Sequence, residues 1–297
     1  MADNITLTTA TRTNLLSLQN TQNLINQTQQ RLATGLKVNS ALDDALAFFK
    51  ARSLNDRASD LSTIKSNIDG SVSVLQAAVQ GLTSIESVLQ QMKALAQSAI
   101  SAPDSVTRSK LASQFNELRS QVDGIAADSS FNGVNLLKNT SGRFAPGADQ
   151  LTVKFNEQTG KGLNQVVISG LKIADFKSIV ATSAVTTGTA GNTTVWGQTG
   201  SAAVTAINSA INAIDSALTT VRAASQEFGT NSALLSIRSD FTTNLINTLK
   251  AGASDLVNAD LNEESANLLS LQTRQQLGTI SLSIAQKSQQ SILRLFP

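Results

Sequence analysis

The chain has 297 residues, of which 41% are hydrophobic, 4% aromatic and 15% charged, and its formal net charge is +2 at pH 7. Because it contains neither His nor Cys, the sequence excludes disulfides and thiolate metal sites and lacks the commonest general base. Its basic residues form no cluster of the kind that binds nucleic acid, and no stretch approaches the roughly 18 apolar residues that span a bilayer. We therefore expect no catalytic, cofactor or metal site, and neither a nucleic-acid nor a membrane partner.

The N-terminal segment predicts a helix with a narrow apolar face. Residues 1–6 lack a basic region followed by an apolar core, so no cleavable secretory signal is expected. Gly35 is typical of a helix end, and Ser40 with Asp43 resembles a capping box for the next helix. The apolar residues of the first helix recur every seven positions among Gln, Asn and Thr, at Leu18, Ile25 and Leu32.

The strongest pattern is a heptad repeat over residues 61–99, which predicts a long helix with one face buried against partner helices. Pro103 interrupts this helix. A second, antiparallel helix is expected to follow it and to end before a turn at residues 132–133. We expect the heptad residues to form the core of a helical bundle, namely Leu61, Ile68, Leu75, Leu82 and Leu89.

The middle of the chain, from about residue 140 to 200, is rich in Gly, Thr and Ser and loses helical periodicity. Residues 151–155 alternate between apolar and polar as a strand does, and residues 165–168 are a second strand candidate. Residues 160–162 lie between them as the loop of a hairpin. Trp196 is expected to be a packing anchor for this region.

Helical periodicity returns after Ser201, with further bundle-core positions at Ile207, Ile211, Ile214 and Leu218. A last helix is expected to begin at Asp260, which forms a second capping signature with Glu263. The apolar side of this helix includes Leu268, Leu277, Ile280 and Ile284.

Together these elements predict a mainly α fold: a long antiparallel helical bundle or coiled coil, with paired N- and C-terminal helices and a small β-rich tip. Terminal helices with few charges and narrow apolar faces are marginal alone, so we expect them to order on assembly. The predicted domains are an inner coiled-coil domain from residues 1–40 and 258–297, a helical-bundle domain from 41–140 and 201–257, and a surface-exposed β-rich region from 141–200.

Two sets of motifs stand at opposite ends of the chain. The N-terminal set is QQRLATGLKVNSALDDA at residues 29–45, RASDL at 57–61 and FNG at 131–133. The C-terminal set is DLVNAD at 255–260, ESA at 264–266, LQTRQQL at 271–277, SIA at 283–285 and SILRLF at 291–296. Both sets resemble the signatures of the bacterial flagellins, over roughly residues 1–140 and 200–297.

This resemblance implies a secreted structural protein that is exported unfolded and self-polymerises into the extracellular flagellar filament for motility. It also implies an export chaperone, the filament cap and hook-associated proteins as partners. In flagellins the terminal helices form an inner coiled-coil tube. We expect the polymerisation interface to contain Leu18, Ile25, Leu32, Leu268, Leu277, Ile280, Ile284, Leu293 and Leu295.

Two other functions share parts of this pattern. A hook–filament junction protein, which is a hook-associated protein, has similar helical ends but does not grow long filaments alone. A cytoplasmic coiled-coil adaptor would form a stable dimer with ordered ends. The closeness of both terminal signatures favours a flagellin.

Overall fold

The structure is a computed structural model that describes residues 9–138, 150–158, 162–171, 195–197 and 201–295. The chain divides into a terminal unit, Met1–Ser59 with Ile246–Pro297, and a central unit, Asp60–Leu245. The terminal unit therefore joins the first and last parts of the chain. This confirms the prediction that the two terminal helices pair.

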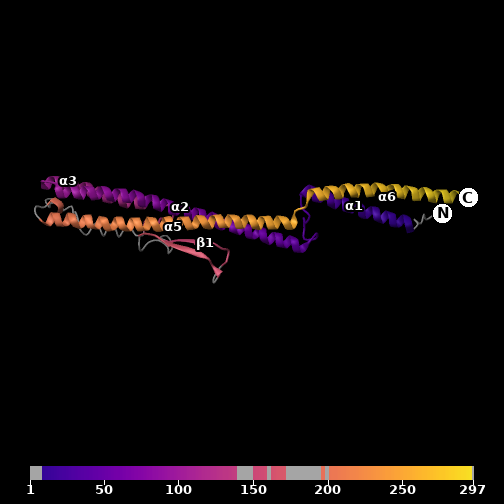
Figure 1. Cartoon of the computed structure of the whole chain (residues 1–297), viewed down its shortest axis with the longest axis horizontal. Coiled ribbons are helices and arrows are strands. Elements are labelled where there is room, and N and C mark those ends of the chain that lie inside the picture. Colours follow the sequence, from indigo (N-terminus) through magenta and orange to yellow (C-terminus); the bar gives the residue numbers. More distant parts are fainter. Residues whose placement is uncertain (1–8, 139–149, 159–161, 172–194, 198–200, 296–297) are drawn as a thin grey trace. The chain divides into compact units, whose positions relative to one another are not determined.

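Helices dominate the chain, as the periodicity predicts (Figure 1). They are α1 (Thr9–Thr34), α2 (Ala45–Ser101), α3 (Ser105–Asp128), α5 (Ser201–Val257) and α6 (Leu261–Leu295), with a 3-10 turn η2 at Val195–Gly197. Strands β1 (Gln150–Lys154) and β2 (Gln165–Ser169) pair antiparallel, with Leu151 opposite Ile168. The mainly α fold with a small β element is confirmed. Gly160, Lys161 and most of the expected β-rich region lie outside the described residues.

The helix ends follow local backbone chemistry. Gly35 has a φ of 71°, a left-handed conformation that favours glycine, and its N–H donates to the carbonyl of Arg31 at 2.8 Å, which ends α1. Asp104 begins α3 by accepting the N–H of Thr107 at 2.7 Å, and this hydrogen bond holds the pKa of Asp104 below its ordinary value. Pro103 falls between α2 and α3, as predicted.

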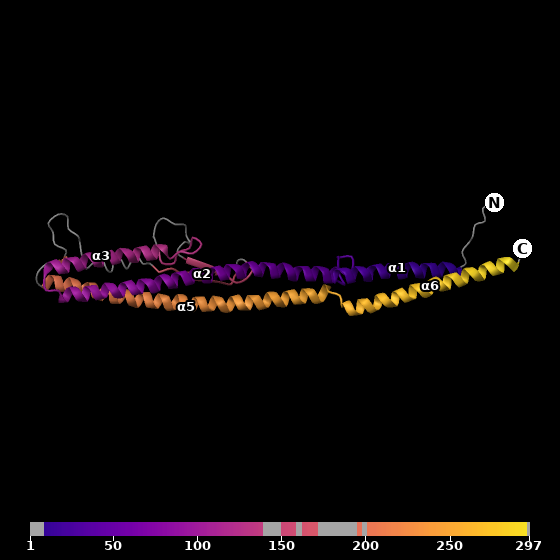
Figure 2. The same cartoon turned by 90° about the horizontal axis from the view of Figure 1, so that it is seen from above.

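In the central unit, α2, α3 and α5 run alongside one another (Figures 1 and 2). Three polar contacts fix α2 and α5 in one antiparallel register, because equal steps forward on α2 match equal steps back on α5. The contacts are Asp69 with Ser239, Glu86 with Arg222, and Lys93 with Asp215. Polar partners thus align two helices whose packing is otherwise apolar.

The core of the central unit is formed by the predicted heptad residues. On α2, Ile68, Leu75 and Leu82 are fully buried, and Leu61 and Leu89 are 3% and 2% exposed. Ser71 is a buried polar residue on the same helix, and its hydroxyl donates to the carbonyl of Asn67 at 2.7 Å. On α5, Ile207, Ile214 and Leu218 are buried, and Ile211 packs against the same core half-buried.

The two strands lie along the side of α2, near residues 60–74, and not at a tip of the bundle (Figure 1), and a few large side chains attach them and η2 to this core. Leu151 and Val153 of β1 and Ile168 of β2 are buried in the core. Trp196 in η2 is fully buried, and its ring centroid lies 4.9 Å from that of Phe115 on α3. The expected anchoring role of this tryptophan is therefore seen in its packing.

Helix α2 differs from the expectation that no segment is long and apolar enough to span a bilayer. By length and composition α2 contains an 18-residue window that could cross a membrane, although no apolar run of that length is evident in the sequence. Of that window 44% is buried inside the protein, and the core helix of a bundle meets the same criterion. The window is therefore weak support for a membrane span.

Ile214→Ala should destabilise the central unit by about 2–5 kcal/mol, because it opens a cavity at a fully buried position. Ile237→Ala on the same helix is the matched control, since Ile237 is 66% exposed and its loss should cost less than about 0.5 kcal/mol. Trp196 is the only tryptophan and there is no tyrosine, so urea unfolding can be followed by intrinsic fluorescence. Equal unfolding midpoints for the two variants would contradict this packing.

Asp69 should make the central unit acid-sensitive. Hydrogen bonds from Lys65 and then from Ser239 lower the pKa of Asp69 below 3.8. Its contribution to stability is therefore present above about pH 5 and is lost as the pH falls through that lowered value. Urea unfolding of the native protein and of Asp69→Asn should differ at pH 7, and the difference should shrink as the pH falls below 3.8. Glu117→Gln, at an exposed position, is the control, and a pH-independent difference for Asp69→Asn would refute the charge effect.

Candidate polymerisation interface

The terminal unit is built on the pairing of α1 with α6. Leu18 reaches Gly278, Gln275 donates to Gln22 at 2.6 Å, and Arg31 contacts Glu264 at 3.0 Å. Positions that advance along α1 thus match positions that recede along α6. The two helices are therefore antiparallel.

The contact surface between the two helices, here called the seam, follows a heptad on both sides. Its positions are three and four residues apart, and each is buried or half-buried. On α1 the seam residues are Thr11, Asn14, Leu18, Thr21, Ile25, Thr28 and Leu32. On α6 they are Glu264, Leu268, Leu271, Gln275, Gly278, Leu282 and Ala285. Polar or small residues thus occupy most layers.

Four large apolar residues of α6 point away from the seam, whereas Leu268, Leu271 and Leu282 lie in it. At 3.6 residues per turn, the positions of Leu269, Leu277, Ile280 and Ile284 lie on the opposite side of the helix. Their exposed fractions are 67%, 60%, 56% and 62%. We call these four residues the back face. On α1, Leu16 occupies the corresponding outer position and is 60% exposed.

The structure therefore divides the predicted interface residues between two surfaces. Leu18, Ile25, Leu32 and Leu268 lie in the seam, whereas Leu277, Ile280 and Ile284 lie on the back face. The side chains of Leu293 and Leu295 lie outside the described residues. Sequence reasoning followed leucine and isoleucine alone. The seam of α6 becomes visible only when Gln275, Gly278 and Glu264 are counted as heptad positions.

Short hydrogen bonds tie the connections between the helices together in the terminal unit. Lys37 N–H donates to the carbonyl of Val257 at 2.7 Å, and Ala259 N–H donates to that of Gly35 at 2.9 Å. The ammonium of Lys37 also donates to the carbonyl of Asp255 at 3.1 Å. The end of α1 is therefore held beside the start of α6 by backbone contacts.

The predicted capping residues have different roles. Asp260 caps α6 by accepting the N–H groups of Asn262 at 2.9 Å and Glu263 at 3.4 Å. Ser40 and Asp43, by contrast, form a turn before α2 rather than its cap. The α2 cap is Asp44, whose carboxylate accepts the N–H of Ala47 at 2.9 Å.

The turn before α2 is stabilised by the carboxylate of Asp43. This carboxylate accepts the N–H groups of Ser40 at 2.9 Å and Asn39 at 3.1 Å, and both hydrogen bonds lower the pKa of Asp43. Two adjacent acidic residues thus serve two neighbouring backbone turns. The capping-box spacing of Ser40 and Asp43 predicts a helix start at Ser40, four residues before the observed cap at Asp44.

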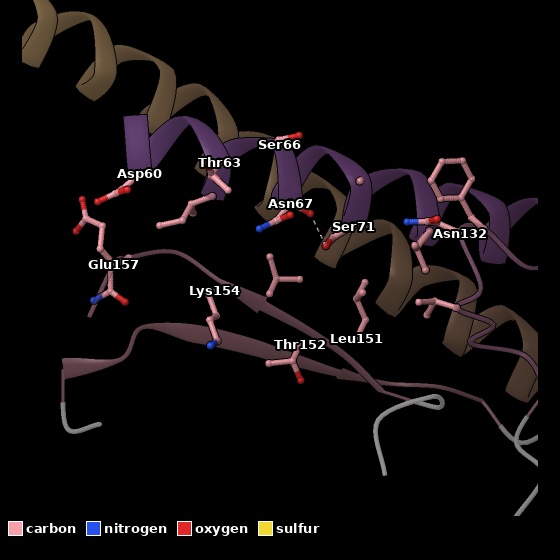
Figure 3. A pocket seen from close by; sticks show the side chains of 17 residues that line it. Asp60, Thr63, Ser66, Asn67, Ser71, Asn132, Leu151, Thr152, Lys154 and Glu157 are labelled. Carbon is pink, nitrogen blue, oxygen red and sulfur yellow. Dashed lines mark hydrogen bonds between the residues drawn. The ribbon is translucent and has the colours of Figure 1, made fainter. Parts of the chain in front are cut away.

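A groove of about 960 Å³ lies in the central unit between α2 and β1 (Figure 3). Asp60 and Glu157 stand at one end of it, and Lys154 of β1 lies farther along. Among the residues that the structure describes, no group of three or more acidic side chains could hold a metal ion. We assign no reaction to the groove.

Comparison with known proteins points to the same two ends of the chain. A model of the bacterial flagellin N-terminal helical region matches residues 5–142, and one of the C-terminal helical region matches residues 211–296. Flagellin FljM of Caulobacter vibrioides is 32% identical over 291 residues, which is 95% of each chain. Flagellin FljO of the same organism is 33% identical over 290 residues, with the same coverage.

A solved structure, that of Bacillus cereus flagellin, is similar with a TM-score of 0.46 and 19% identity. It covers 59% of this chain and 88% of that one. The two family matches include the helices that pair here as α1 and α6, and the similarity to the Caulobacter proteins extends over nearly the whole length. The chain belongs to the bacterial flagellin family.

Proposed function

We propose that this flagellin polymerises by folding its paired terminal helices against neighbouring copies. As a flagellin it is a secreted subunit that self-assembles into the extracellular flagellar filament. The observation that carries the proposed mechanism is the distribution of apolar residues on α6, where four of the seven seam residues are polar or small and the back face carries four large apolar residues.

Burial in the seam alone contributes little to the stability of the two helices. Ordering the backbone costs about 1–2 kcal/mol per residue, and helices in proteins depend mainly on burial of an apolar face. Fully burying one Leu or Ile contributes roughly 1.5–3 kcal/mol. Of the large apolar seam residues, Ile25 is 4% exposed, whereas the five leucines of the seam are only half-buried. We infer that α1 and α6 are marginal in the isolated subunit.

The back face supplies the missing burial once a second copy covers it. Its four side chains are more than half exposed, so covering them contributes on the order of 4–7 kcal/mol per subunit. That is close to the roughly 8 kcal/mol of a micromolar affinity before other contacts are added. In a head-to-tail array the back face of one copy contacts a different surface of the next copy. This contact therefore repeats along an open helix and does not close into a dimer.

The remaining expectations fit this mechanism. An exposed apolar back face on the unassembled subunit supports an export chaperone as a partner that covers it. The subunits at the growing end of the filament support contacts with the filament cap and hook-associated proteins. We retain the division into an inner coiled-coil domain, a helical-bundle domain and a surface-exposed region. We infer a structural rather than an enzymatic role. No finding favours the hook–filament junction alternative.

Removal of residues 1–34 or 261–297 should block polymerisation and leave the central unit folded, because its core contains no residue from either segment. Sedimentation and electron microscopy measure filaments, and Trp196 fluorescence measures folding of the central unit. Normal filaments from either truncated chain would remove the mechanism.

Leu277→Gln with Ile284→Gln should raise the critical concentration for polymerisation at least about tenfold, since 1.4 kcal/mol of lost contact suffices for that change. Central-unit unfolding, followed by Trp196 fluorescence, should not change. Gln276→Ala, at an exposed position on the same helix, is the control and should polymerise normally. An unaltered critical concentration for the double variant would show that the back face is not buried in the filament.

A further inference from the structure

We propose that the ion pair between Arg31 and Glu264 sets the register of α1 against α6 and so selects the subunit conformation that can join a filament. This inference rests on the proposed function, because register matters only if the paired helices are the polymerising element. Its consequence is distinct: Arg31 and Glu264 act as positioning residues, whereas the back face supplies contact area.

The geometry of the pair is that of a partly buried charge contact. The Arg31 guanidinium lies 3.0 Å from Glu264 Oε1, between the last turn of α1 and the first turn of α6. The Glu264 side chain is only 10% exposed and that of Arg31 is 33% exposed. A buried carboxylate without a partner is strongly unfavourable, so Glu264 tolerates only an arrangement that supplies a cation.

Among the other seam residues, Gly278 also favours the native register, because its lack of a side chain admits Leu18. Sliding α6 by one heptad in one direction places Gly278 opposite Ile25 and Leu271 opposite Leu32. Apolar residues still meet small or apolar partners, although Ala285 then replaces Gly278 opposite Leu18. In that register Glu264 passes the end of α1 and loses Arg31, and the nearest cation, Lys37, already donates to the carbonyl of Asp255.

Sliding α6 by one heptad in the other direction is also disfavoured by charge. Glu264 then lies opposite Ile25, and Arg31 extends past the first residue of α6. Both slipped registers therefore leave a charge without its partner, while the native one pairs both. A single polar position that fixes the register of a coiled coil is an established use of such residues.

Register matters for assembly because the back face moves with α6. A slip of one heptad shifts α6 by about 10 Å along α1. Leu277, Ile280 and Ile284 would then no longer meet the surface that they meet in neighbouring, correctly paired subunits. A slipped subunit would therefore be rejected at the growing end.

A second feature near the ion pair could also set the register of α1 against α6. The backbone contacts between residues 35–37 and 257–259 also hold α1 beside α6. These contacts use main-chain atoms, so replacement of the two charged side chains leaves their chemistry unchanged. The two determinants can therefore be separated by substitution.

Because the chain contains no cysteine, introduced cysteine pairs report the register directly. Gln22→Cys with Gln275→Cys reports the native register, since these side chains are in contact at 2.6 Å. Gln22→Cys with Leu282→Cys reports a slip of one heptad. Each pair is placed in the full-length native chain, in Arg31→Leu with Glu264→Leu, and in the charge-swapped Arg31→Glu with Glu264→Arg. Intramolecular disulfide is measured after mild oxidation of assembled and unassembled fractions.

In the assembled fraction of the native background we expect disulfide in the native reporter alone, whereas unassembled subunits, whose terminal helices are not ordered, should not favour either reporter. The apolar variant should raise the ratio of slipped to native disulfide at least about tenfold, because the penalty on slipped registers is removed. The charge-swapped variant should restore the native ratio and filament formation. If the apolar variant does not assemble while the swapped one does, charge pairing is required and the inference stands.

Native-only disulfide in an assembling apolar variant would overturn the register role and leave the backbone contacts as its source. Failure of both variants to assemble would also overturn it, since complementary charge would not then be the determinant. Failure of the proposed function is a separate result: the native chain with neither substitution would form no filaments, as sedimentation of that control shows.

Discussion

The proposed assembly depends on a helix pair whose shared surface has a polar or small residue in most of its layers. Thr11, Thr28 and Glu264 are buried between α1 and α6, at positions that a self-sufficient coiled coil would give to leucine or isoleucine. The four large apolar residues of the back face lie outward on α6. We propose that such a subunit folds its ends only when another copy covers them, which keeps it exportable and restricts ordering to the filament.

The central unit has the opposite character. Its core contains Leu75, Leu82 and Ile214 without exposure to solvent, and its helices are aligned by ion pairs at the edge of that core. This core contains no residue of α1 or α6. We propose that the chain combines a self-sufficient scaffold with ends that fold conditionally. Helices α2 and α5 each contribute residues to both units.

Much of the fold is predictable because the heptads of α2 and α5 contain the apolar residues that form the core. Gly35 and Pro103 mark helix ends for reasons that hold in isolation. The candidate interface is less accessible to sequence reasoning. Leu277 and Ile284 look like seam residues by type, yet the seam is chosen by Gly278, which admits Leu18, and by Glu264, which pairs with Arg31. Such choices depend on a partner helix more than two hundred residues away in the sequence.

The central claim is that α1 and α6 order only when copies assemble. Hydrogen exchange read by mass spectrometry, on the monomer and on the filament, tests this most directly. The account predicts rapid exchange of α1 and α6 in the monomer, slow exchange of both in the filament, and slow exchange around Leu75 and Ile214 in both states. Protected terminal helices in the monomer, at concentrations where no filaments form, would contradict it.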